Sequence, residues 1–288
     1  MVTGKDIREN LQLLDPHNDF KEASNCHLSL LIQRDSLSYA QYHIPSKTYF
    51  GIGEYHAGIW ESSRALEIVS TLEKIPALNQ VYRSVSLAVS GPVVTFVPKP
   101  VFDASKLTEY VEAHAQVSPM YSLRHYPVDS HHSEAIYAIP PRVEEAFEQH
   151  FAGLKIMPIQ TPFIDYWTRQ ISPRIGQHIV LRFGVDFMQL YAWKGTELIL
   201  ANTFNITTPE DAVYYLLFTM EQLEFDANLA PVVIQGGLEE DSPIFELIFK
   251  YVRNIYMGER PQHENYSFAL DDVPSSEHFG LFAQYYCV

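Results

Sequence analysis

The sequence is poor in cysteine and lacks any long apolar run. Only two cysteines occur among the 288 residues, Cys26 and Cys287, and they stand near opposite ends of the chain. This spacing offers no disulfide framework and no cysteine metal site; a single disulfide between the two would need an oxidising compartment, and we expect two reduced thiols. The first twenty residues are too polar for a signal peptide, and no stretch approaches the ~18 apolar residues of a membrane span. We therefore expect a cytoplasmic protein without a membrane span.

Positive charge is also scarce. The chain has 20 Lys and Arg against 35 Asp and Glu, a net charge of −15. Residues 1–175 carry a net charge of −4 and residues 176–288 carry −11. Nucleic-acid affinity depends mainly on neutralisation of phosphates by Lys and Arg, so nucleic acid is excluded as an expected partner.

What the sequence does contain is a globular composition with a repeated pattern. Hydrophobic residues make up 47% of the chain. The first half predicts three meandering strands, then a helix ended by Pro76, then two further strands. These strands are expected at residues 27–33, 37–44, 48–55, 81–89 and 93–97, and the apolar stripe of the helix is Ala65, Ile68, Val69, Leu72 and Ile75.

The second half repeats this order between residues 178 and 256. Three strands are predicted at residues 179–183, 187–193 and 198–204. Thr208 is expected to cap the N-terminus of a helix, with Pro209 in the first helical position. Asp211 is expected to complete a capping box by accepting a hydrogen bond from the Thr208 amide. A short strand at 232–234, a helix from Ser242 to about Asn254 and a last strand at 266–270 complete the prediction.

Residues 100–175 follow a different pattern. We expect helices at 105–114, 141–151 and 161–170 and strands at 122–128, 134–139 and 154–159. This region is interpreted as an extension or inserted subdomain of the first half. The sequence therefore predicts an α/β protein of two domains, residues 1–175 and 176–288.

One stretch of the second half resembles a known family. The segments NTFNITTPEDAVYYLLFTMEQL, PVVIQGG and FELIFKYVRNI are similar to a Bacteroidetes family known as domain of unknown function 3822. The residues that carry the resemblance are Asn202, Phe204, Asp211, Tyr214, Tyr215, Gly236, Tyr251 and Arg253. The resemblance implies a bacterial protein with the actin-like ATPase fold, in which two ribonuclease H-like βββαβα halves flank a cleft, and it implies no established activity.

The wider actin, Hsp70 and sugar-kinase superfamily suggests where ATP and Mg²⁺ would bind. By that resemblance, Asp35 and Asp186 occupy the two phosphate hairpins, and Gly236 and Gly237 occupy the adenosine segment. Neither hairpin keeps the superfamily pattern, because no glycine stands near Asp35 and bulky Phe187 follows Asp186. Phosphate loops need bare backbone amides, so the sequence makes ATP hydrolysis doubtful.

Other catalytic constellations are weak. His125, His131 and His132 lie close in sequence, but neighbouring strand residues point to opposite faces, so we interpret them as a solvated hairpin tip without a metal. Cys26 has no local partner that would activate its thiol.

Three functions remain open. The first is a non-catalytic or degenerate actin-like protein that acts as a protein-binding or scaffold module. The second is an ATP-dependent enzyme or kinase with atypical phosphate loops at Asp35, Asp186, Gly236 and Gly237. The third is a binder of a small ligand in the cleft between the halves. A monomer or weak oligomer is expected, since no coiled-coil heptads occur.

Overall fold

The computed structural model describes residues 8–16, 22–33, 36–59, 64–171 and 176–288. The chain divides into two compact units. Unit 1 comprises residues 1–163, 263–272 and 280–288, and unit 2 comprises residues 164–262 and 273–279. The domain boundary expected at residues 175 and 176 stays a prediction.

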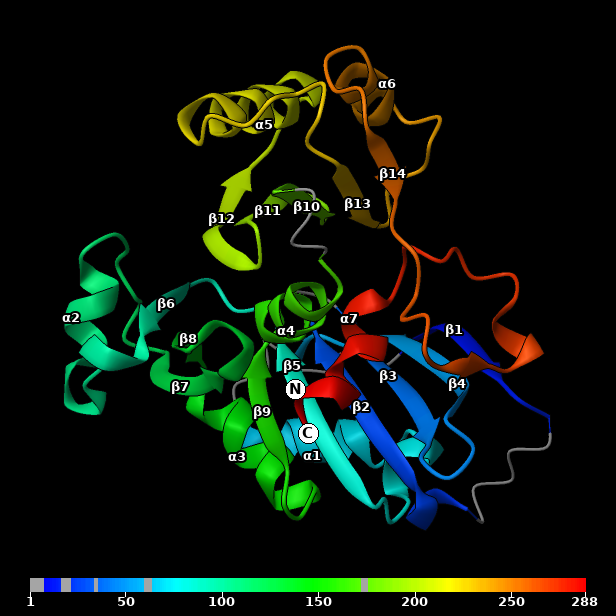
Figure 1. Cartoon of the computed structure of the whole chain (residues 1–288). Coiled ribbons are helices and arrows are strands. Elements are labelled where there is room, and N and C mark those ends of the chain that lie inside the picture. The colour runs from blue at the N-terminus through cyan, green and yellow to red at the C-terminus, as the bar shows by residue number, and fades with distance from the viewer. Residues whose placement is uncertain (1–7, 17–21, 34–35, 60–63, 172–175) are drawn as a thin grey trace. The chain divides into compact units, whose positions relative to one another are not determined.

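Unit 1 is built on a seven-stranded sheet whose main path runs β1-β4-β3-β2-β5-β9 (Figure 1). Its strands are β1 (Arg8–Leu14), β2 (Cys26–Ile32), β3 (Ser36–His43), β4 (Thr48–His56), β5 (Ser84–Val89), β9 (Lys155–Pro158) and β15 (Asn265–Tyr266). Helices α1 (Ala65–Leu72) and α3 (Pro141–His150) pack together on one face. They bury the apolar side chains that alternate along β2 and β5, among them Leu28, Leu30, Leu87 and Val89.

Unit 2 repeats this plan with a five-stranded sheet in the order β12-β11-β10-β13-β14. The strands are β10 (Gln177–Phe183), β11 (Phe187–Lys194), β12 (Glu197–Asn205), β13 (Val232–Gly236) and β14 (Ile255–Met257). Helices α5 (Pro209–Gln222) and α6 (Pro243–Phe249) close over its apolar core, and α4 (Gln160–Gln170) lies mainly in this unit. Each unit thus has an antiparallel meander followed by parallel strands reached through helices, which confirms the predicted repeat.

A small third sheet is inserted between β5 and α3. It has the order β6-β8-β7, with β6 (Val94–Pro98), β7 (Ser122–Val128) and β8 (Ser133–Ile139). Helix α2 (Leu107–Glu112) covers one face, where Val97, Val111 and Ile136 form a separate core. The strands and the helix expected here are confirmed.

Helix α5 shows why local sequence can fix an element's start. The Thr208 side chain accepts a bond from the Asp211 amide, and the Asp211 carboxylate accepts one from the Thr208 amide. These bonds satisfy amides that the first helical turn leaves open. Hydrogen bonds from Thr207 and Thr208 lower the pKa of Asp211 to about 2. The capping box predicted from the sequence is therefore confirmed.

Two predictions near the C-terminus are wrong in extent. The strand expected at 266–270 ends at Tyr266, because Ser267 accepts a bond from the Ala269 amide and starts the 3-10 turn Phe268–Leu270. Helix α6 ends at Phe249 rather than near Asn254, since the chain must leave the helix for Ile255–Met257 to pair with β13. Strand β14 itself was not predicted.

The second face of the unit 1 sheet carries buried polar residues, among them His27 and Ser86, beside the aromatic residues Tyr42 and Tyr49, and the 3-10 helix Ala283–Cys287 contacts β2 and β5. His27 Nδ1 lies 2.8 Å from Ser84 Oγ, and Nε2 lies 3.0 Å from Ser86 Oγ. Ser86 donates to Gln284 Oε1 at 2.7 Å, and Gln284 donates to the Leu30 carbonyl at 3.0 Å. Because Ser86 donates to Gln284, it accepts from His27 Nε2. Burial disfavours the charged imidazole by lowering the pKa of His27, and in the neutral ring Nδ1 accepts from Ser84.

No helix of the described residues is long and apolar enough to cross a membrane.

The state of His27 makes stability depend on pH. Burial, with a smaller effect of the Lys155 charge, lowers the pKa of His27 from 6.5 to about 3. Below pH 6.5, His27 binds a proton in the unfolded chain but stays neutral in the folded chain. The free energy of unfolding therefore falls as pH drops from 6.5 toward 3. The slope from this group approaches ~1.4 kcal/mol per pH unit.

We predict that His27→Gln, which can donate to one serine and accept from the other, removes this slope. Urea unfolding of both chains between pH 7.5 and 5 measures it. The stability difference between the wild type and the variant should shift in favour of the variant as pH falls. Parallel stability curves would show that His27 is not held neutral.

Candidate functional site

The two hairpins that resemblance assigns to phosphate binding close in the same way. The Gln33 amide donates to the Ser36 carbonyl at 3.0 Å, and the Gly184 amide donates to the Phe187 carbonyl at 2.9 Å. Asp186 lies in the second of these turns, where the Val185 side chain is fully exposed. Asp35 falls in the first hairpin by sequence but lies outside the described residues. The Gly184 amide is thus used by the hairpin itself.

The Phe187 ring explains the glycine at position 184. A Cβ atom at Gly184 would collide with this ring, so the ring lies directly against the backbone there. On the same hairpin, the buried Arg182 guanidinium lies 5.5 Å from the ring centroid and donates to Gln189 at 3.1 Å. Gly184 therefore makes room for an aromatic side chain of its own hairpin.

The Gly236-Gly237 segment lies at the same end of the unit 2 sheet. Gly236 pairs with Phe183 across the parallel strands, has φ +102°, and leaves only 2.5 Å between a Cβ and the Phe183 carbonyl oxygen. Strand packing and a left-handed backbone therefore account for this glycine. Its amide donates to the Ser276 carbonyl at 2.9 Å. Glu277 Oε1 lies 3.9 Å from the position of a Cβ at Gly237, which adds a carboxylate to the surroundings.

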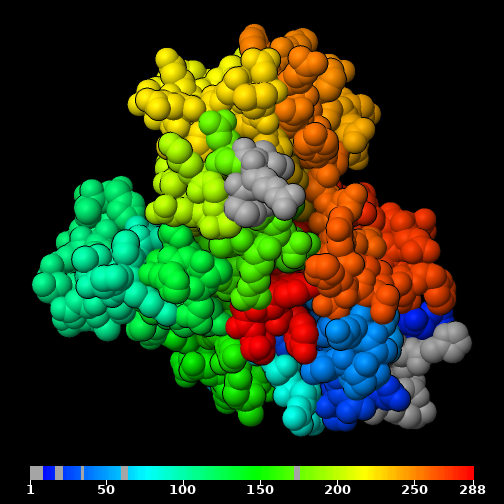
Figure 2. Space-filling view, in the orientation of Figure 1, coloured from blue at the N-terminus to red at the C-terminus, as the bar shows by residue number. Residues whose placement is uncertain are grey.

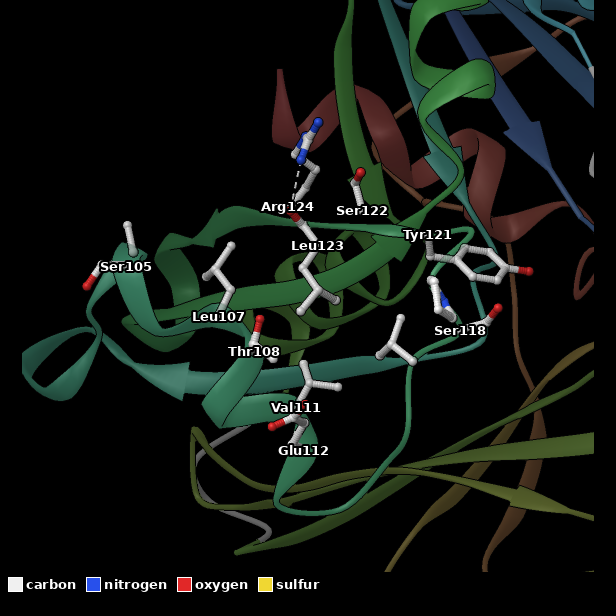
Figure 3. A pocket seen from close by; sticks show the side chains of 13 residues that line it. Ser105, Leu107, Thr108, Val111, Glu112, Ser118, Tyr121, Ser122, Leu123 and Arg124 are labelled. Carbon is white, nitrogen blue, oxygen red and sulfur yellow. Dashed lines mark hydrogen bonds between the residues drawn. The ribbon is translucent and has the colours of Figure 1, made fainter.

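A pocket of about 480 Å³ lies elsewhere, in the inserted sheet of unit 1 between α2 and β7 (Figure 3). Leu107 and Val111 of α2 and Leu123 of β7 supply apolar side chains to it. Thr108 and Ser118 add hydroxyl groups at its margin. Helix α2 spans only six residues, so it covers part of the sheet face and leaves this recess beside β7.

Strand β7 is the edge of that sheet, since its order is β6-β8-β7. Arg124 of β7 points out of the pocket and is held by a bidentate pair with Glu144, with both N–O distances 2.7 Å. The pocket is therefore bounded by a helix on one side and by a strand edge on the other. Sequence reasoning missed it, because the spacing of Leu107 and Val111 predicts only an apolar helix face.

Comparison with known proteins places the chain. Residues 15–255 match the family described as protein of unknown function (DUF3822). The chain belongs to the DUF3822 family. The family resemblance noted in the sequence is confirmed. No curated protein matches the chain.

Solved structures define the fold of this DUF3822 protein. A Bacteroides thetaiotaomicron protein with an actin-like ATPase fold and unknown function superposes with a TM-score of 0.73 at 17% identity, over 88% of this chain and 96% of that one. One chain of the PilM-PilN type IV pilus biogenesis complex superposes with a TM-score of 0.59 at 12% identity, over 91% of this chain and 98% of that chain. The DUF3822 chain therefore has the actin-like fold.

Of the four residues assigned to ATP, the structure brings three together. Asp186, Gly236 and Gly237 lie at the carboxyl ends of β10 and β13, the sheet edge where open α/β sheets bind ligands. Asp35 cannot be placed with them. Exposed Glu239, Glu240 and Asp241 follow the glycines, and their charge opposes a phosphate. The assignment of these residues to a nucleotide stays a prediction.

Metal and thiol chemistry find little support in the part of the chain that is described. There, no group of three or more His, Cys, Asp or Glu side chains could hold a metal ion. His125 pairs with Glu134 at 2.9 Å. Cys26 and Cys287 are free thiols. Burial and the Glu22 charge raise the pKa of Cys26 to about 11, so this thiol is a poor nucleophile at neutral pH.

This geometry predicts that titration of Mg-ATP into the DUF3822 protein gives no heat of binding and does not raise its free energy of unfolding. A ligand at 100 times its Kd would add about 2.7 kcal/mol to the free energy of unfolding. We expect no such gain, because the Gly184 and Gly236 amides already have carbonyl partners. Calorimetric titration measures the heat of Mg-ATP binding, and thermal unfolding measures the change in stability. Asp35→Ala and Asp186→Ala are the matched variants. Micromolar affinity that either variant abolishes would contradict the prediction.

Proposed function

We propose that this DUF3822 protein is a non-catalytic, degenerate actin-like protein that binds a partner protein. Its binding site is the pocket between α2 and β7, and the ligand is an extended peptide segment of the partner. The observation that carries the proposal is a recess bounded by a helix and by the edge strand of the same sheet.

A strand edge specifies the form of the ligand. An extended peptide can add to a sheet edge through main-chain hydrogen bonds, while pockets beside the edge select its alternate side chains. Here the recess beside Leu123 has an apolar floor from Leu107 and Val111. We infer that one apolar side chain of the peptide enters it, while the peptide backbone runs along β7.

The chemistry of the pocket agrees with a peptide more than with a reacting small molecule. Its margin carries hydroxyl groups and one exposed carboxylate, that of Glu112. Arg124, a cation among the lining residues, is engaged by Glu144 and by the Leu123 carbonyl. A recess with an apolar floor and hydroxyl groups at its margin suits a side chain and a peptide backbone.

The comparisons give further support. One structure that shares the fold is that of a PilM-PilN complex, so a protein of this fold occurs in a complex with a different protein. The closed amides at Gly184 and Gly236 also favour a binding role over ATP chemistry. The ATP-dependent enzyme and the cleft-bound small ligand both stay alternative predictions.

Selection of a random 16-residue peptide pool on the full chain tests the proposal. We expect peptides with an apolar anchor whose Kd rises at least tenfold on Thr108→Trp, which fills the pocket from an exposed position of α2. Binding should also slow hydrogen exchange of Ser122, Leu123 and Arg124.

Leu66→Trp is the matched control, because Leu66 is exposed on α1 of the same unit. It should change the Kd less than twofold. Failure to select any peptide that Thr108→Trp weakens would overturn the assignment of the pocket.

A further inference from the structure

Unit 2 carries a connected series of aromatic rings that runs from its edge strand onto its surface. Phe204 of β12 stacks on Tyr215 of α5 with centroids 4.5 Å apart, and Tyr215 contacts Tyr214 at 5.4 Å. Tyr214 stacks on Phe218 one turn later, at 5.9 Å and 17°. We call these four residues the ring ladder.

The outer half of the ring ladder is exposed. Tyr214 is 61% exposed and Phe218 is 47% exposed. The buried stripe of α5 is made by other residues, Ala212, Val213, Leu216, Thr219 and Met220. Tyr214 and Phe218 therefore contribute little to the core, and they leave a paired aromatic surface in water on helix α5 (yellow in Figure 2). Adjacent exposed rings of this kind are typical of interaction sites.

The charges of α5 have one sign. The helix contains Glu210, Asp211 and Glu221 and no Lys or Arg. Glu210 and Glu221 are both exposed. Glu210 precedes Tyr214 by four residues, and Glu221 follows Phe218 by three. Residues three and four apart are neighbours on a helix surface, so the exposed ring pair lies between two carboxylates.

We propose that the ring ladder and its two carboxylates form a second docking surface, for a partner segment that combines Lys or Arg with apolar residues. The exposed carboxylates attract Lys and Arg, and the aromatic faces accept apolar side chains and cations. Charge complementarity decides the occupant. A second copy of this chain would bring another acidic face, since residues 176–288 carry a net charge of −11.

The helix geometry sets the spacing of the cations. Glu210 and Glu221 are eleven residues apart on α5, which is about 16 Å at 1.5 Å per residue. An extended segment covers this distance in about five residues. Two basic residues about five positions apart, with apolar residues between them, would place their charges at both carboxylates and their apolar side chains on the rings. This surface lies in unit 2 and is separate from the α2–β7 pocket of unit 1.

The same random peptide pool tests this proposal when selected on the full chain carrying Thr108→Trp, in which the α2–β7 pocket is filled. Enriched peptides should be rich in Lys or Arg and apolar residues. Their Kd should rise at least tenfold on Tyr214→Ser with Phe218→Ser, and also on Glu210→Lys with Glu221→Lys. Binding should weaken as salt rises.

Tyr256→Ser is the matched control, because Tyr256 is an exposed aromatic residue on β14, at the opposite edge of the same sheet. It should change the Kd less than twofold. Enrichment of acidic peptides would overturn the proposal, and so would peptides whose Kd is the same for the serine variant. Failure to enrich any peptide would also overturn it. A wild-type dimer that the serine variant dissociates in sedimentation velocity would instead identify a second copy as the occupant and overturn it too.

Discussion

Hydrogen bonds between residues 263–288 and the sheets are the interaction on which the rest of the structure depends. Residues 263–272 and 280–288 complete unit 1, while residues 273–279 complete unit 2. In unit 1, Gln284 joins the hydrogen-bond chain of His27, and the Tyr42 and Tyr286 hydroxyls both donate to Glu264. In unit 2, the Ser276 carbonyl receives the Gly236 amide. Because a buried polar group without a partner is costly, the Ser86 hydroxyl and the Gly236 amide need these segments.

Two glycine amides at the ends of the unit 2 strands already have partners within the chain. The Gly184 amide donates to the Phe187 carbonyl of its own hairpin, whose ring lies against Gly184, and the Gly236 amide donates to the Ser276 carbonyl. Two surfaces lie on peripheral elements, the recess between α2 and β7 and the exposed rings of α5. The proposed role as a protein-binding module rests on these two surfaces and not on the actin-like fold itself, because one fold can carry many functions.

Local patterns predicted most of the elements, and long-range contacts account for what was missed. The capping box of Thr208 and Asp211 needs only neighbouring residues, so the sequence predicts it in full. Strand β1 has the polar sequence RENLQLL and exists because it pairs with β4. The α2–β7 pocket depends on how α2 rests on the sheet, and the bond from Gly236 to Ser276 joins residues forty positions apart. Neither can be seen in a local pattern.

The central claim is that the glycine amides of unit 2 belong to the fold and not to a nucleotide. Amide hydrogen exchange of Gly184 and Gly236, followed by NMR on the full chain with and without Mg-ATP, measures this directly. The account predicts slow exchange at both amides that Mg-ATP leaves unchanged. Fast exchange at Gly236 without nucleotide, together with protection on addition of Mg-ATP, would show that the site is open and would contradict the account.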